Sequence, residues 1–161
     1  MALVSPISRC LWSDRDALEA AEFSSAILPD SRVLDARRFT GTTPDPSGAV
    51  PFVDFLLNGQ RFQAINGGAL FRFDGAVSFV VECRDQQVID RRRDALPEGG
   101  GTPVQCGWLR DRFGPCWHIV PSGFAEMMRG PEPRRAAQAM AARYAMVKFD
   151  GAGLQAAYDA G

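Results

Sequence analysis

The stretch CGWLRDRFGPCWHIVP, Cys106 to Pro121, decides how this chain is interpreted. It holds two of the three tryptophans and the only histidine, and one turn signal ending in Gly114 interrupts it. Two β-favouring runs around a short glycine-containing loop predict a β-hairpin. In the second strand Cys116, His118 and Val120 would share one face, because side chains alternate along a strand. On that face His118 is the side chain whose charge changes near neutral pH.

Bulk properties exclude several classes of partner. The chain has 161 residues with 18 basic and 19 acidic side chains, so its formal net charge is −1. Nucleic-acid-binding surfaces concentrate positive charge and no long basic run is present, so we expect no nucleic-acid partner. No stretch of 18 apolar residues and no signal-peptide pattern occur, so we expect no membrane contact and a cytoplasmic location. Four cysteines without CxxC spacing predict free, buried thiols.

The first half of the chain predicts a strand, a helix and three more strands. The expected elements are a strand at 7–12, a helix capped by Asp16 and ended by Pro29, strands at 32–39 and 50–57 around a turn-rich loop at 41–48, and a strand at 61–65. The small and apolar residues that recur on one helical face suit close packing on a sheet: Ala17, Ala20, Ala21, Ser24, Ile27 and Leu28. The Asn58-Gly59 pair is the strongest hairpin signal in the chain.

The same order of elements then begins again. The second set is a strand at 77–83, a helix at 86–96 capped by Asp85 and ended by Pro97, a loop at 98–103, and the hairpin at 106–121. The two capping aspartates lie 69 residues apart and the two terminating prolines lie 68 apart. Such similar offsets indicate a structural duplication. We expect the three arginines at 91–93 to form a solvated face of the helix, with the aliphatic part of one side chain packed flat against the protein.

The C-terminal part predicts a helical tail. A helical turn is expected at 124–128, a helix at 131–147 and a short helix at 154–158. The apolar face of the longest helix would comprise Ala136, Met140, Ala141, Tyr144 and Val147. These helices carry more apolar surface than water favours, so we expect them to dock on a sheet or on a second subunit.

Four motifs in combination carry a family resemblance: INGG at 65–68, VSFVVECRDQQVID at 77–90, CGWLRDRFG at 106–114 and WHIVP at 117–121. Together they resemble the PhnB-like branch of the vicinal oxygen chelate (glyoxalase/bleomycin resistance/dioxygenase) superfamily, whose members are often labelled 3-demethylubiquinone methyltransferase-like. The resemblance runs from about Ile7 to the end of the chain. It implies one α+β domain of paired βαβββ modules, at about 7–68 and 76–121, with cupped mixed and antiparallel sheets around a cavity, C-terminal helices at about 124–161, and a homodimer.

Metal-using members of that superfamily place His or Glu ligands on the first and fourth strands of the modules. In the first module this chain has Arg9, Cys10 and Leu11 on the first strand and Phe62, Gln63 and Ala64 on the fourth. In the second module it has Ser78 where metal-binding members commonly have His, and His118 where they usually have Glu. A divalent ion needs three or more convergent donors, so we expect no metal. The glycines of Gly151-Ala152-Gly153 follow no predicted strand, so we expect no methyl-donor or other cofactor either.

The resemblance places a ligand in the cavity inside the cupped sheets. The expected lining residues are Trp12, Gln63, Asn66, Ser78, Trp108 and His118. Tryptophan would cover an apolar ligand, while Gln63, Ser78 and His118 would offer hydrogen bonds. Asn66 is explained equally well by turn geometry.

Three functional classes stay open on this evidence. The first is a metal-free small-molecule-binding module. The second is an enzyme of the superfamily with a non-standard metal or substrate site and catalytic residues that the sequence does not identify. Separately, Cys106 and His118 would form a nucleophile and base pair if their side chains meet across the hairpin. The third is an oligomeric interaction protein with a vestigial cavity.

Overall fold

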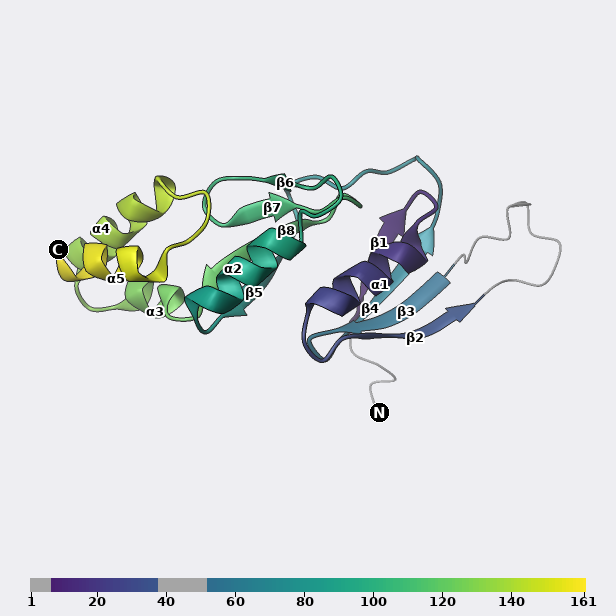
Figure 1. Cartoon of the computed structure of the whole chain (residues 1–161), viewed down its shortest axis with the longest axis horizontal. Coiled ribbons are helices and arrows are strands. Elements are labelled where there is room, and N and C mark those ends of the chain that lie inside the picture. Colours follow the sequence, from purple (N-terminus) through teal and green to yellow (C-terminus); the bar gives the residue numbers. More distant parts are fainter. Residues whose placement is uncertain (1–6, 38–51) are drawn as a thin grey trace. The chain divides into compact units, whose positions relative to one another are not determined.

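The structure, a computed structural model, describes residues 7–37 and 52–161, so the predicted loop at 41–48 lies outside the described residues. The chain forms two compact units, Met1–Phe73 (unit 1) and Asp74–Gly161 (unit 2). Each unit holds a four-stranded sheet with a helix packed on it, and unit 2 adds a tail of three helices (Figure 1). The predicted α+β fold of two βαβββ modules with C-terminal helices is confirmed.

Unit 1 contains five elements in the predicted order. They are β1 (Arg9–Ser13), α1 (Ala17–Ile27), β2 (Arg32–Arg37), β3 (Phe52–Leu57) and β4 (Gln60–Asn66). The strand order is β1-β4-β3-β2, with β1 parallel to β4 and the other pairs antiparallel. Asn58 and Gly59 have φ angles of 50° and 72°, the left-handed conformations that a two-residue hairpin turn requires. The predicted hairpin turn is therefore confirmed.

The core of unit 1 lies between α1 and its sheet. Alternate residues of β3 are buried, and α1 contacts β3 and β4. On the helix side Ala17, Ala21 and Ser24 are buried, as predicted. Ser24 Oγ donates to the carbonyl of Ala20 at 2.9 Å, so its hydroxyl is satisfied inside the helix. Small side chains let the helix axis approach the sheet closely.

Unit 2 repeats this topology. Its elements are β5 (Ser78–Cys83), α2 (Gln86–Ala95), β6 (Thr102–Pro103), β7 (Trp108–Arg110) and β8 (Cys116–Pro121), in the order β5-β8-β7-β6. As in unit 1, the first strand is parallel to the fourth. The same backbone bond follows each pair: Gly67 N donates to Ser13 O, and Ser122 N donates to Cys83 O, both at 2.9 Å. The duplication inferred from the offsets is thus present in the structure.

The two helices begin in different ways. Asp85 caps α2 as predicted, since its carboxylate accepts from Val88 N at 2.8 Å. The capping prediction for Asp16 is wrong, because its side chain makes no capping hydrogen bond. Asn66 at the end of β4 takes that role, with its Oδ1 accepting from Ala17 N at 2.9 Å.

The turn between β7 and β8 is organised by a buried aspartate. Asp111 is 4% exposed, and its carboxylate accepts from Phe113 N at 2.8 Å and from Trp117 Nε1 at 2.7 Å. The second bond ties the turn to Trp117 near the start of β8. It fixes the register in which Trp108 lies opposite His118.

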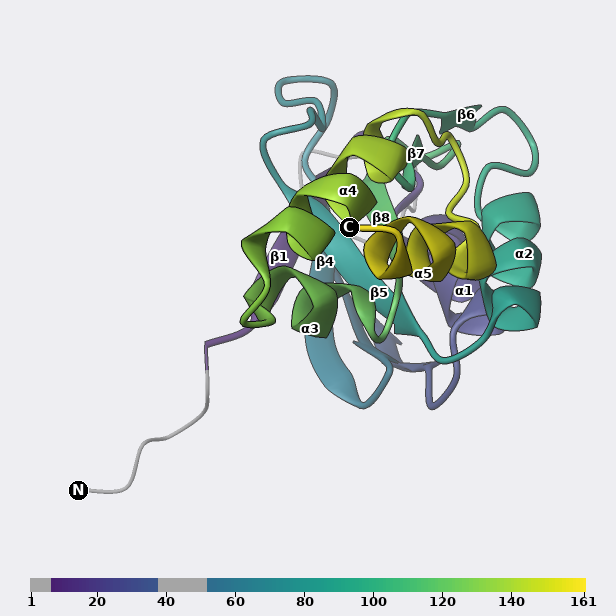
Figure 2. The same cartoon turned by 90° about the vertical axis from the view of Figure 1, so that its left-hand side faces the viewer.

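The tail docks on the sheet of unit 2. It comprises α3 (Phe124–Arg129), α4 (Pro133–Tyr144) and α5 (Gly151–Asp159), and α4 and α5 lie side by side (Figure 2). Phe149, just before α5, is fully buried in a cluster with Val120 of β8 and Leu154. The segment before it is tied to the start of the hairpin by two backbone hydrogen bonds. Cys106 N donates to Met146 O at 2.7 Å, and Gly107 N donates to Val147 O at 3.1 Å.

The predicted apolar face of α4 is only partly correct. Ala139 is the buried residue of this helix, whereas Tyr144 is 63% exposed and Val147 beyond its end is 48% exposed. The helix packs chiefly against α5 and α3, and the partly buried Ala142 faces the Phe149 cluster. The side of α4 that is buried is therefore set by those neighbours and not by its largest apolar residues.

Exchanging Phe149 for Ala should lower the free energy of unfolding by about 3–5 kcal/mol, because a fully buried ring is lost and leaves a cavity. Tyr144→Ala, which removes an exposed ring, should change it by about 0.5 kcal/mol. Urea titration followed by circular dichroism measures both. Equal losses in the two variants would contradict the assigned docking of the tail.

Asp111→Ala should lower the free energy of unfolding by about 2–4 kcal/mol, because a buried indole N–H and a backbone N–H lose their acceptor. Asp74 is a matched control, since its carboxylate accepts from Ala76 N two residues on but at an exposed site. We expect Asp74→Ala to lower the free energy of unfolding by less than about 1 kcal/mol. Thermal unfolding of both variants compares them, and a similar loss for each would refute the special role of Asp111.

Candidate functional site

In each unit one face of the sheet packs against a helix, and we call the opposite face the open face. In unit 2, α2 contacts β8 on the side of Ile119, so His118 belongs to the open face. Trp108 of β7 stacks on His118 with ring centroids 5.1 Å apart and an angle of 27° between the rings. The carbonyl of Trp108 accepts from the buried Arg93 at 2.6 Å, which fixes this strand against α2. Arg93 is thus the packed stem among the three arginines.

The imidazole of His118 is held by a backbone carbonyl. Its Nε2 lies 2.9 Å from the carbonyl oxygen of Cys106. A carbonyl oxygen can only accept, so the proton resides on Nε2 and Nδ1 keeps its lone pair. Burial lowers the pKa of His118, and the charge of Arg143 lowers it further, while the bond to Cys106 raises it. The ring is therefore neutral at pH 7 and offers Nδ1 as an acceptor.

The tail occupies part of the space beside His118. The ring of Phe149 lies 6.2 Å from the imidazole, and Cys106 Sγ donates to the carbonyl of Arg143 at 3.7 Å. His118 contacts the carbonyl of Cys106 and not its thiol, so this geometry does not form the nucleophile and base pair considered above. The neighbouring strand leaves Val80, opposite His118 in register, 59% exposed. Ser78 at the start of that strand is half-buried.

The open face of unit 1 carries a polar cluster. Arg61 binds the carboxylate of Asp54 through two bonds, of 3.1 Å and 2.8 Å, and Gln63 donates to the same carboxylate at 3.4 Å. Gln63 pairs with Cys10 in register, as His118 pairs with Val80. Gln63 and His118 therefore occupy equivalent positions in the two repeats.

Trp12 and Asn66 have local structural partners. Trp12 Nε1 donates to Gly68 O at 2.8 Å, and its ring meets Phe71 edge-on at 4.9 Å. A Cβ at Gly67 would lie 2.2 Å from the Trp12 ring, so only glycine fits there. The INGG motif thus reflects packing of Trp12 and capping of α1 by Asn66.

The six predicted lining residues are divided equally between the units. Unit 1 holds Trp12, Gln63 and Asn66, and unit 2 holds Ser78, Trp108 and His118. The structure brings Trp108 and His118 into contact, and it commits the Asn66 side chain to the start of α1. Contact of any of the six with a ligand stays a prediction.

The donor atoms do not suit a superfamily-type metal. Within residues 7–37 and 52–161, no three His, Cys, Asp or Glu side chains form a group that could hold an ion. The cysteines are free thiols, and Cys83 and Cys116 are buried as predicted. Cys10 is exposed, because its side chain lies on the open face near the start of β1, so the expectation of burial is wrong there. The glycines at 151–153 form the start of α5 and follow no strand.

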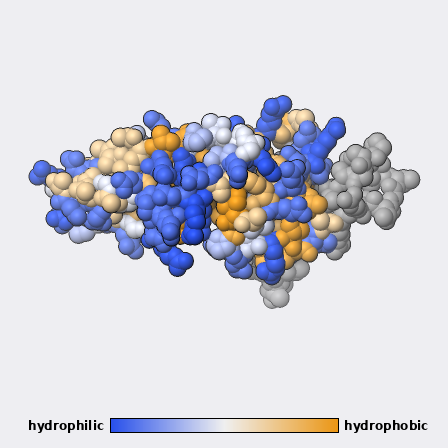
Figure 3. All heavy atoms as spheres, viewed as in Figure 1, coloured by the Kyte–Doolittle hydropathy of each residue, from blue (hydrophilic) through white to orange (hydrophobic). Residues whose placement is uncertain are grey.

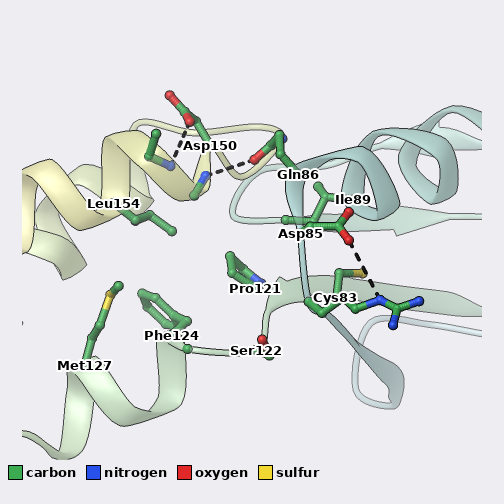
Figure 4. A pocket seen from close by; sticks show the side chains of 14 residues that line it. Cys83, Asp85, Gln86, Ile89, Pro121, Ser122, Phe124, Met127, Asp150 and Leu154 are labelled. Carbon is green, nitrogen blue, oxygen red and sulfur yellow. Dashed lines mark hydrogen bonds and ion pairs between the residues drawn. The ribbon is translucent and has the colours of Figure 1, made fainter.

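Sequence patterns did not reveal a pocket of about 300 Å³ in unit 2 (Figure 4). It lies where β5 and β8 end, and the first turns of α2 and α5 and the helix α3 border it. None of the six predicted residues lines it. The signal available in the sequence was only the general rule that crevices form at the carboxyl ends of parallel strands.

Comparison with known proteins identifies the family. The model of the 3-demethylubiquinone-9 3-methyltransferase family matches residues 5–120. The chain belongs to this family. The PhnB protein from Bacillus cereus, whose description is 3-demethylubiquinone-9 3-methyltransferase, is 27% identical with a TM-score of 0.66, over 73% of this chain and 100% of that chain. Protein PA1353 from Pseudomonas aeruginosa is 18% identical with a TM-score of 0.58, over 71% and 96%.

Two further comparisons complete these findings. A glyoxalase/bleomycin resistance protein from Albidiferax ferrireducens T118 is 14% identical with a TM-score of 0.45, over 70% of this chain and 96% of that chain. Among curated proteins none matches. Within the described residues, no helix has the length and apolar character that crossing a membrane requires.

The family match stops at residue 120, short of the tail that the resemblance had included. The whole Bacillus cereus chain is covered by 73% of this chain. Helices α3 to α5 thus lie beyond the residues that the family model matches.

The pKa of His118 should lie below its ordinary value of about 6.5. As the pH falls, His118 is therefore protonated at a higher pH in the unfolded chain than in the folded protein. The free energy of unfolding should decrease from about pH 6.5 down to the pKa of His118 in the folded protein. The free energy of unfolding of His118→Gln should not show this decrease. Because the chain has one histidine, a proton NMR titration follows the ring directly. A pKa at or above 6.5 would contradict the described environment.

Proposed function

We propose that the protein is a metal-free small-molecule-binding module whose ligand lies in a cavity against the open face of a cupped sheet. The observation that carries this proposal is the stacked pair of Trp108 and His118. It combines a flat aromatic surface with an acceptor, Nδ1, that has no hydrogen-bond partner among residues 7–37 and 52–161. Ligand sites typically combine apolar walls with a few such oriented polar groups.

The surroundings of this pair favour a flat, largely apolar ligand with a hydrogen-bond donor. Val80 extends the apolar surface beside His118, and Ser78 adds a hydroxyl on the same face of β5. In unit 1 the position equivalent to His118 holds the amide of Gln63, and Trp12 provides an indole. A neutral imidazole attracts a hydroxyl or N–H donor, whereas a cationic ring would repel it.

An enzymatic role is the first alternative. The description of the Bacillus cereus relative names a methyltransferase, and this chain would then supply a non-standard metal or substrate site. Elemental analysis of the purified protein tests it: a stoichiometric transition metal that is lost in His118→Ala would favour the enzyme.

A role as a homodimeric interaction protein is the second alternative. Val80, Val104 and Val147 in unit 2 are each about half exposed, and such apolar surface favours contact with another chain. Sedimentation at several concentrations tests for the dimer, and Val80→Asp should shift the equilibrium toward monomer.

Phenol and toluene form a matched probe pair, since they share a ring and differ in the hydroxyl donor. We expect phenol to bind about three- to tenfold more tightly, the contribution of one hydrogen bond to Nδ1. His118→Phe keeps an aromatic ring and should abolish this preference. Quenching of tryptophan fluorescence measures binding, and Gln155→Ala, at an exposed position of α5, is the control.

Trp108→Ala should weaken both probes, because it removes the surface on which they stack. A preference for phenol that survives in His118→Phe would contradict the proposed acceptor. Absence of binding by either probe to the unaltered protein would contradict the proposed function.

A further inference from the structure

The pocket at the ends of β5 and β8 is apolar inside and acidic at its rim. Leu154 of α5 and Phe124 of α3 point into it from opposite sides, with Ile89 and Pro121 on its inner wall (Figure 4). Asp85 and Asp150 stand at the rim beside the helix starts. A volume of about 300 Å³ is at the lower end of the range for pockets that take small organic molecules.

Comparison of the two repeats explains why the strand ends are open here. In unit 1 Asn66, the last residue of β4, bridges the strand end to the first turn of α1. The residue in the same register position of unit 2 is Pro121, which has no side-chain acceptor. The cap of α2 comes instead from Asp85, the residue directly before the helix, and not from the end of β8.

The tail completes the pocket and holds its walls in place. The Gln86 side chain donates to Phe149 O at 2.9 Å and accepts from Gly151 N at 3.0 Å, which ties α5 to α2. Lys148 pairs with Asp90 at 2.7 Å beside this bridge. These contacts fix the separation of the two helices, so the pocket is preformed. It is built partly from residues beyond the family match at 120.

The charges at the rim select the ligand. The N–H groups that usually attract anions at helix starts already have acceptors: Val88 N binds Asp85, Ala152 N binds Asp150, and Gly151 N binds Gln86. The two carboxylates would repel an anion. Arg84 also lines the pocket and lies 3.8 Å from Asp85, whose charge it offsets. Asp150 has no ion-pair partner among the described residues, so the uncompensated charge at the rim is negative.

We propose that this pocket is a second binding site, for a small and mainly apolar amine. The apolar body lies between Leu154 and Phe124, and the ammonium group lies at the rim beside Asp150. The site is separate from the open face that carries Trp108 and His118, and its residues belong to unit 2 alone.

Three probes of one shape test this assignment: 3-phenylpropylamine, 3-phenyl-1-propanol and 3-phenylpropanoate, which are cationic, neutral and anionic. Titration of the full chain, followed by amide NMR signals, should shift residues 83–89, 121–127 and 150–154. We expect the amine to bind about two- to fivefold more tightly than the alcohol, as for an exposed ion pair, and the carboxylate to bind most weakly.

Asp150→Asn keeps the helix cap and should remove the preference for the amine over the alcohol. Asp159→Asn, on the same helix but outside the pocket, should retain the preference for the amine. Ala152→Trp should fill the pocket and abolish binding of all three probes. Ala156→Trp, outside the pocket, should leave the affinity for the probes unchanged.

Signals that shift elsewhere, equal binding of the carboxylate, or probe binding that survives Ala152→Trp would overturn the proposal. Because the His118 and Trp108 variants leave this pocket intact, the outcome is independent of the proposed site on the open face.

Discussion

The structure of unit 2 depends on one buried hydrogen bond, from Trp117 Nε1 to Asp111 at 2.7 Å. It joins the turn to the strand that follows and fixes the register of β7 against β8. A shift of one residue would exchange the two faces of β8, because strand side chains alternate. Trp117 and Ile119 would then leave the core, and His118 would leave the open face. The position of the candidate site thus follows from the geometry of one turn.

Two copies of one topology have diverged where their strands end. In unit 1 Asn66 links the end of β4 to α1, and glycines make room for Trp12. In unit 2 Pro121 cannot make that link, and the tail closes the region instead. Charged and polar side chains cover the solvent side of α2, as the hydrophilic colouring shows (Figure 3). This helix is thus solvated outside and anchored inside by Arg93 and Ile89.

Local chemistry allowed prediction of most of the fold. The Asn58-Gly59 turn, the Asp85 cap and the Cys106 to Pro121 hairpin depend on residues close in sequence, and all three are confirmed. The cap of α1 was not predictable, because its acceptor comes from a residue 49 positions away. The placement of Phe149 beside His118 also depends on a distant contact. The pocket in unit 2 was missed because three separate segments form it.

We propose that the protein binds an organic molecule through the aromatic and hydrogen-bonding groups of Trp108 and His118 on the open face of unit 2, without a metal. A crystal structure of the protein, purified without added ligand or chelator, tests it most directly. We expect electron density for an organic molecule against Trp108 and His118, within hydrogen-bond reach of Nδ1. An ion held there by three or more protein side chains would contradict it, as would open faces filled entirely by the protein's own side chains.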